Sequence, residues 1–111
     1  MRERRSSPRR KFALPIGGSV GTARVRVIDA SLAGLGVEHE DHLPPPGGIC
    51  RLALFSDSGP IQVDCAIVRT IAQNAEAVAK GLFRTGLQVL SADFQSRQRL
   101  QALIVEHTKK G

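Results

Sequence analysis

The chain has 111 residues, 41% of them hydrophobic and 23% charged, which fits one globular domain with a single core. Six of its 16 Lys and Arg residues lie in the first eleven positions beside one acidic residue, so this stretch carries +5 of the net charge of +6. A basic arm on a nearly neutral body favours a local anion site over a broad nucleic-acid surface. No apolar run approaches the roughly 20 residues of a membrane span, and the charged N-terminus is unlike a secretory signal, so we expect a cytoplasmic protein with no membrane partner.

Residues 1–11 are the first expected unit, a flexible basic arm with too few apolar groups to pack against a core. Arg5 and Arg9 stand four positions apart in this arm, and Arg4 precedes them. The planar guanidinium of arginine bonds phosphate oxygens, or the O6 and N7 atoms of guanine, through two parallel hydrogen bonds. The arm therefore carries groups suited to a guanine nucleotide or a phosphodiester.

Residues 12–111 are expected to form one all-β domain, because alternating apolar residues are separated by turn signals at short intervals. The expected strands cover residues 12–16, 23–28, 35–38, 49–55, 61–71 and 77–90. Six such strands suit a closed antiparallel β-barrel, which leaves no exposed sheet edge. A C-terminal α-helix over about residues 92–109 completes the expected fold.

Breaks in the alternation mark the expected strand ends and irregularities. The prolines at positions 44–46 cannot donate to a strand ladder, so they mark a connection. Arg69 interrupts the apolar face of the fifth strand. The glycines expected to end the first strand or to kink the sixth are Gly17, Gly18, Gly21, Gly81 and Gly86.

The terminal helix is expected to have a cap and one apolar face. Ser91 can cap its start, with Asp93 in the first turn. The residues at helical spacing are Phe94, Leu100, Leu103, Ile104 and His107. Such a face packs against one end of the barrel or against a second copy in a dimer, and the sequence does not choose between them.

Asp29, Ser31 and Gly34 occupy an expected turn after the second strand. The N1–H and N2–H donors of guanine need an acceptor such as the Asp29 carboxylate, and the Ser31 hydroxyl can add a contact. Gly34 would let the backbone approach the base closely or turn with a positive φ. The turn is thus complementary to the guanine edge that arginine does not bind.

The order and spacing of these two motifs resemble the PilZ family, which binds the bacterial second messenger cyclic di-GMP. The matching segments are Arg5-Ser-Ser-Pro-Arg9, Asp29-Ala-Ser31-Leu-Ala-Gly34, and Gly86-Leu-Gln-Val-Leu90 followed by the helix. The resemblance implies a cyclic di-GMP receptor that regulates a separate effector protein, without catalysis and without a cofactor besides the ligand. It implies ligand contacts from Arg4, Arg5, Arg9, Asp29, Ser31 and Gly34, and Arg4 makes an intercalated pair of ligand molecules plausible.

Other interpretations use the same residues differently. A nucleic-acid-binding barrel would use the basic arm on phosphates, but the chain has no Trp or Tyr and only four Phe for base stacking. A PilZ-like interaction module without ligand binding usually lacks the arginines or the Asp-x-Ser-x-x-Gly turn. An enzyme is least favoured, because His39 and His42 are expected in a polar loop without catalytic or metal-binding partners. Cys50 and Cys65 are expected to be reduced core residues.

Overall fold

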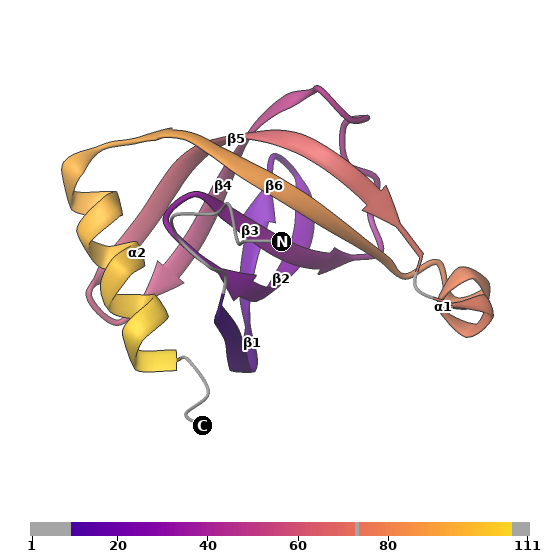
Figure 1. Cartoon of the computed structure of the whole chain (residues 1–111), viewed down its shortest axis with the longest axis horizontal. Helices are drawn as coiled ribbons and strands as arrows, with labels where there is room; N and C mark the ends of the chain where they lie inside the picture. Colours follow the sequence, from indigo (N-terminus) through magenta and orange to yellow (C-terminus); the bar gives the residue numbers. More distant parts are fainter. Residues whose placement is uncertain (1–9, 73, 108–111) are drawn as a thin grey trace, which may run out of the picture.

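Alternating apolar residues build six antiparallel strands that close into a barrel, with a helix against one end (Figure 1). The structure, a computed structural model, describes residues 10–72 and 74–107. The strands are β1 (Arg10–Val20), β2 (Ala23–Ala30), β3 (Gly34–His39), β4 (Ile49–Ser56), β5 (Gly59–Ile71) and β6 (Phe83–Ala92), and the helices are α1 (Ala75–Lys80) and α2 (Phe94–His107). Around the barrel the order is β1-β2-β3-β6-β5-β4, and β4 pairs with β1 to close it. The expected all-β barrel with a C-terminal helix is confirmed.

The first strand begins earlier than expected. Arg10 pairs with Ala30 and Lys11 pairs with Asp29, so both residues belong to the barrel sheet instead of the arm. The remainder of the expected arm, residues 1–9, lies outside the described part of the chain.

The same strand also continues further than expected, through Gly17 and Gly18 to Val20. The expectation that these glycines end the strand is wrong. A Cβ atom on Gly18 would lie 2.5 Å from Cδ2 of Leu54 and 2.6 Å from the carbonyl oxygen of Ala53. Glycine is needed at this position because β4 approaches closely to close the barrel.

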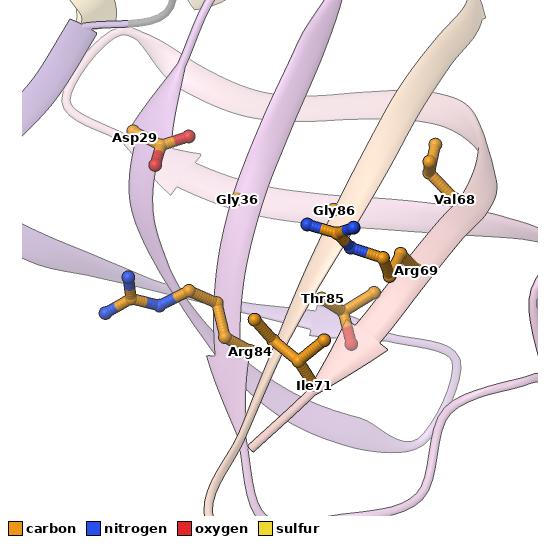
Figure 2. Close-up of a pocket in the computed structure, with 8 residues that line it drawn as sticks. All are labelled: Asp29, Gly36, Val68, Arg69, Ile71, Arg84, Thr85 and Gly86. Carbon is orange, nitrogen blue, oxygen red and sulfur yellow. The ribbon is translucent and has the colours of Figure 1, made fainter. Parts of the chain in front are cut away.

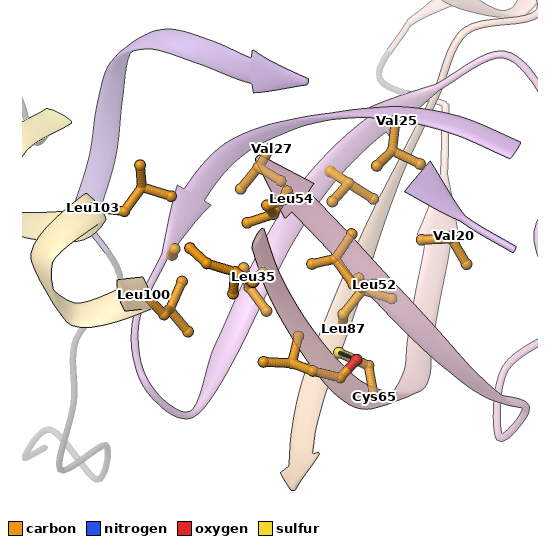
Figure 3. Packing of buried hydrophobic residues seen from close by; sticks show 14 of the residues in the cluster. Val20, Val25, Val27, Leu35, Leu52, Leu54, Cys65, Leu87, Leu100 and Leu103 are labelled. Atoms are coloured by element: carbon orange, nitrogen blue, oxygen red, sulfur yellow. Dashed lines mark hydrogen bonds between the residues drawn. The ribbon is translucent and has the colours of Figure 1, made fainter. Parts of the chain in front are cut away.

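Inward-facing side chains from the strands form one core, which α2 closes at one end (Figure 3). The strand residues in it include Val20, Val25, Val27, Leu35, Val37, Leu52, Leu54, Ile61, Val63, Cys65, Ile67 and Leu87. Leu100, Leu103 and Ile104 of α2 belong to the same cluster. Of the two expected roles for the helix, the structure shows the barrel plug. Phe94, expected on the buried face, is instead 72% exposed.

The cap of α2 is Asp93 and not Ser91. Oδ1 of Asp93 accepts the backbone N–H of Ser96 at 2.7 Å, which satisfies a donor of the first turn. Ser91 still belongs to β6, and its hydroxyl donates to Asp64 at 3.1 Å. The expected start of the helix was therefore placed too early.

The expected sixth strand is half wrong, because residues 75–80 form the short helix α1. The side chain of Asn74 accepts the backbone N–H of Ala77 at 2.8 Å and caps its start. Gly81 ends it with φ 67°, in the left-handed conformation. No helix in the described residues is long and apolar enough to cross a membrane.

A β-bulge interrupts β2 just before Asp29. Val27 pairs with Val37 and Asp29 pairs with the next residue of β3, so Ile28 is an extra residue in the ladder. Since an extra residue reverses the alternation of faces, Asp29 is directed outward although Val27, two positions earlier, is in the core.

A second bulge interrupts β5 just before Arg69. Ile67 pairs with Leu87 and Arg69 pairs with Gly86, which leaves Val68 as the extra residue. Arg69 consequently faces outward. The expectation that it interrupts the apolar face of the strand is therefore wrong. The irregularity expected near Gly86 is thus opposite that glycine, in β5.

Candidate ligand-binding cleft

Four strands contribute one residue each to a single row across the outside of the barrel. Asp29 of β2 pairs with Gly36 of β3, Gly36 pairs with Gly86 of β6, and Gly86 pairs with Arg69 of β5. The row thus runs from a carboxylate over two glycines to a guanidinium. These four residues line a cleft of about 420 Å³, together with Val68, Ile71, Arg84 and Thr85 (Figure 2). Small-molecule sites commonly have volumes of about 300–1,000 Å³.

The two glycines make a floor with no side chains. A Cβ atom on Gly36 would lie 2.7 Å from Oδ1 and 2.9 Å from Oδ2 of Asp29, so the carboxylate lies across the position that a side chain would fill. A Cβ atom on Gly86 would meet nothing within 4 Å among the described residues, which shows open space above this strand. A flat group can therefore approach the backbone of β6 closely, beside the carboxylate that lies over β3.

Ser31 shapes the turn that follows Asp29. Its hydroxyl oxygen accepts the backbone N–H groups of Ala33 and Gly34, each at 3.1 Å, and its own N–H donates to the Gly34 carbonyl at 2.8 Å. Ser31 is only 5% exposed and does not line the cleft. The hydroxyl is the type of acceptor that stabilises such turns.

Gly34 lies in close contact with the neighbouring strand. Of the two expected reasons for a glycine here, a positive φ is not found, and a close approach of the backbone to a ligand stays a prediction. A Cβ atom at this position would lie 3.0 Å from the carbonyl oxygen of Leu87 in β6. Glycine allows β3 and β6 to pair at the point where β3 begins.

Two arginines line the cleft in different electrostatic settings. Arg84 donates to Oε2 of Glu38 at 3.1 Å, and Glu38 also lies 3.8 Å from Arg26. The guanidinium of Arg69 has no hydrogen bond or ion pair with residues 10–72 and 74–107. In Figure 2 it lies beside Gly86, while the Arg84 guanidinium lies across β3. The net charge of the Arg69 side chain is therefore not neutralised within the described part of the protein.

A series of polar contacts that begins at the buried His39 supports the floor from inside the barrel. Nε2 of His39 and the hydroxyl of Thr85 lie 2.6 Å apart, and the Thr85 hydroxyl is 2.7 Å from that of Thr70. Nδ1 of His39 donates to the Asp41 carbonyl at 2.7 Å. His39 is 2% exposed and lies in β3, so the expectation of a polar loop is wrong for this residue. In the described ranges no three His, Cys, Asp or Glu side chains are arranged to hold a metal ion.

The two cysteines are unsuited to chemistry at the cleft. Cys50 and Cys65 are free and pair across β4 and β5. Burial raises the pKa of Cys65 to about 12, with smaller contributions from Cys50 and Asp64, and burial also raises the pKa of Cys50. Both thiols are therefore protonated and poorly nucleophilic at neutral pH.

The cleft contains one of the expected ligand contacts and several residues that the sequence did not identify. Asp29 lines it, Ser31 and Gly34 shape the adjoining turn, and Arg4, Arg5 and Arg9 lie outside the described residues. The residues missed by the sequence analysis are Gly36, Val68, Arg69, Ile71, Arg84 and Thr85. They come from three strands and meet only through the pairing register, and the sequence does not display that register.

Comparisons with known proteins agree with this architecture. The PilZ domain model matches residues 3–106, and no curated protein matches the chain significantly. The chain is similar to the PilZ domain of YcgR from Escherichia coli, solved with c-di-GMP, at 20% identity and a TM-score of 0.68, covering 95% of this chain and 92% of that one. It is also similar to the motility inhibitor MotI (DgrA) of Bacillus subtilis, at 16% identity and a TM-score of 0.71, covering 95% of this chain and 51% of that one. At these identities the structural likeness shows the fold, whereas the match to the domain model spans nearly the whole chain. The chain belongs to the PilZ family.

Proposed function

We propose that this protein is a cyclic di-GMP receptor that changes its surface on ligand binding and thereby regulates a separate effector protein. The observation that carries the proposal is the cleft, which combines the Asp29 carboxylate, two glycines and two arginines. A carboxylate accepts from the N1–H and N2–H donors of guanine, and arginines match its acceptor atoms and the phosphodiesters. The PilZ domain of YcgR, whose fold is similar, was solved with c-di-GMP.

The start of β1 supports a contribution from the arm. Lys11 pairs with Asp29, so the chain that precedes β1 joins the barrel beside the cleft. Arg5 and Arg9 would then neutralise the phosphodiesters while Asp29 holds a guanine. Binding would order the arm against the barrel and create the surface that the effector recognises.

Isothermal titration with cyclic di-GMP at about 150 mM salt tests this proposal, with GTP and cyclic di-AMP as competitors. We expect saturable, guanine-selective binding, and the stoichiometry will show whether Arg4 holds a second ligand molecule. Loss of a bidentate arginine costs about 1–3 kcal/mol, so Arg5→Ala or Arg9→Ala should lower the affinity by roughly five- to 150-fold. Asp29→Ala should weaken binding as well.

Arg24→Ala is the matched control, because Arg24 is an exposed arginine of β2 that does not line the cleft. Equal losses from the three arginine variants would indicate generic attraction to an anion and not a specific site. No binding at high protein concentration would contradict the receptor and leave an interaction module. Limited proteolysis of the arm should slow at saturating ligand, and an unchanged rate would contradict the ordering step.

A further inference from the structure

We propose that Arg69 is a further ligand-binding residue, which bonds the N7 and O6 atoms of the guanine that Asp29 holds by its opposite edge. This inference rests on the proposed function and adds a residue outside both recognised motifs. The guanine ring would lie above the row formed by Asp29, Gly36, Gly86 and Arg69, between the carboxylate and the guanidinium.

The direction of Arg69 is the first argument. In a regular strand Arg69 would share the inward face of Ile67, where a guanidinium would be buried in an apolar core. The bulge at Val68 turns it outward into the cleft. Bulges often re-aim a side chain next to a functional site, at the cost of an interrupted ladder. The same device directs Asp29 into the cleft, one residue after the bulge at Ile28.

The charge of Arg69 is the second argument. Arg84, the other arginine of the cleft, is held by Glu38 at 3.1 Å and so has a structural partner. Arg69 has no such partner among residues 10–72 and 74–107, although it lies in the same cleft. A ligand that offers two acceptors to Arg69 gains hydrogen bonds without breaking an ion pair between described residues.

The spacing across the row is the third argument. Asp29 and Arg69 are separated by three strand intervals, or about 14 Å between Cα atoms at roughly 4.8 Å per interval. The carboxylate and the guanidinium both lie on the outer face of the sheet, one at each end of the row, with the two glycines between them. Val68 and Ile71 add aliphatic surface at the Arg69 end of the cleft.

The chemistry of the two ends selects guanine. Its N1–H and N2–H donors lie at the opposite end of the base from N7, so one ring satisfies both Asp29 and Arg69. Adenine places an amino group where guanine has O6 and lacks the N1–H donor, so it would face both residues with the wrong polarity. Arg5 and Arg9 are then left for the phosphodiesters and the second base.

The test combines protein variants with an altered ligand. Cyclic di-GMP and its 7-deaza analogue, in which carbon replaces N7, are titrated against the full chain and its Arg69→Ala and Arg69→Lys variants. Arg97→Ala is the control, since Arg97 is an exposed arginine of α2 outside the cleft. Thermal unfolding of each variant shows that it is folded, as expected for substitutions of exposed residues.

We expect Arg69→Ala to lower the affinity for cyclic di-GMP by roughly five- to 150-fold, the range for a bidentate arginine–guanine contact. Arg69→Lys should restore little, because lysine supplies the charge without the fork. The wild type should bind the 7-deaza ligand more weakly than cyclic di-GMP. The Arg69→Ala variant should bind the two ligands with equal affinity.

Two results would overturn the inference while leaving the receptor proposal intact. One is wild-type affinity in Arg69→Ala. The other is an equal penalty for the 7-deaza ligand in the wild type and in Arg69→Ala, which would show that Arg69 acts at another part of the ligand. Absence of binding by the wild-type protein would instead overturn the receptor proposal, and this inference with it.

Discussion

The bulge at Ile28 of β2 and the bulge at Val68 of β5 perform the same geometric task by different means. In β2 the extra residue, Ile28, is 8% exposed and packs into the protein, whereas in β5 the extra residue, Val68, is 57% exposed and lines the cleft. Burial of Ile28 stabilises the β2 bulge directly, because the extra side chain is removed from water. Val68 gains little of this energy. The β5 bulge is therefore better explained by the direction it gives to Arg69 than by packing.

The sharpest test of this comparison is the stability of two matched truncations. Ile28→Ala should reduce the free energy of unfolding by about 2–4 kcal/mol, because it removes buried side-chain volume. Val68→Ala should change it by no more than about 0.5 kcal/mol, as is usual for an exposed position. Urea unfolding measures both, and similar losses from the two variants would contradict the distinction between the bulges.

The second test concerns β6, which lies between β3 and β5 in the barrel. Thr85→Val removes the hydroxyl that bonds the buried His39 and should cost about 1–3 kcal/mol of stability, because the imidazole nitrogen is left without that partner. Thr70→Val is the control, since Thr70 is exposed and its hydroxyl can be replaced by water. Equal effects of the two substitutions on urea unfolding would show that the hydrogen bond between Thr85 and the buried His39 contributes no more to stability than the one between Thr85 and the exposed Thr70.

The third test changes the floor on the Asp29 side. Gly36→Ala should displace the Asp29 carboxylate, which occupies the place of the new methyl group, with a stability change below about 1 kcal/mol because the end of a side chain can move. The affinity for cyclic di-GMP should fall, by roughly five-fold if about 1 kcal/mol is lost. Gly86→Ala meets open space in the free protein, so any loss of affinity there reports contact with the ligand itself. Unchanged titrations for both variants would argue against a base on this floor.

The smallest expected effect concerns Cys65, a buried residue of β5 that precedes the bulge at Val68. Burial raises the pKa of the Cys65 thiol from 9.0 to about 12, so folding favours the protonated form. The associated stability is fully present below about pH 9 and is lost as the pH rises toward the folded-state value. Urea unfolding near neutral pH and at alkaline pH should show this extra loss in the wild type and a shallower loss in Cys65→Ala. Parallel pH profiles would contradict the assignment.

The sequence predicted the parts of the fold that depend on local patterns. Alternation in segments such as 23–28 and 49–55 located the strands, and the proline run at 44–46 located a connection. The errors arose where distant packing or a local cap decides the outcome. Gly18 was expected to end a strand, but the close approach of β4 requires glycine at this position. The Asn74 and Gly81 caps stabilise a helix in a segment that was expected to be a strand.

The sequence predicted the Asp29 end of the candidate site but not the Arg69 end. Asp29 was identified because it belongs to a recognisable motif, but it was expected in a turn and instead lies in β2, one residue after the bulge at Ile28. Arg69 was instead interpreted as a break in an apolar face, because period-two alternation assigns it to the interior. A bulge is fixed by pairing with a partner strand, so one strand's sequence does not reveal which way the next side chain points.

The pairing of β1 with β4, which we call the seam of the barrel, affects how the protein unfolds. There Gly18–Val20 pair with Leu52–Leu54, whereas β4 and β5 pair along the whole of β4. The shortest ladder opens with the least loss of hydrogen bonds, so amide hydrogens of this seam should exchange with solvent before those of β5. The seam belongs to the strand that follows directly from residues 1–9. Tension applied through the N-terminus would therefore reach the weakest join of the barrel through a single strand.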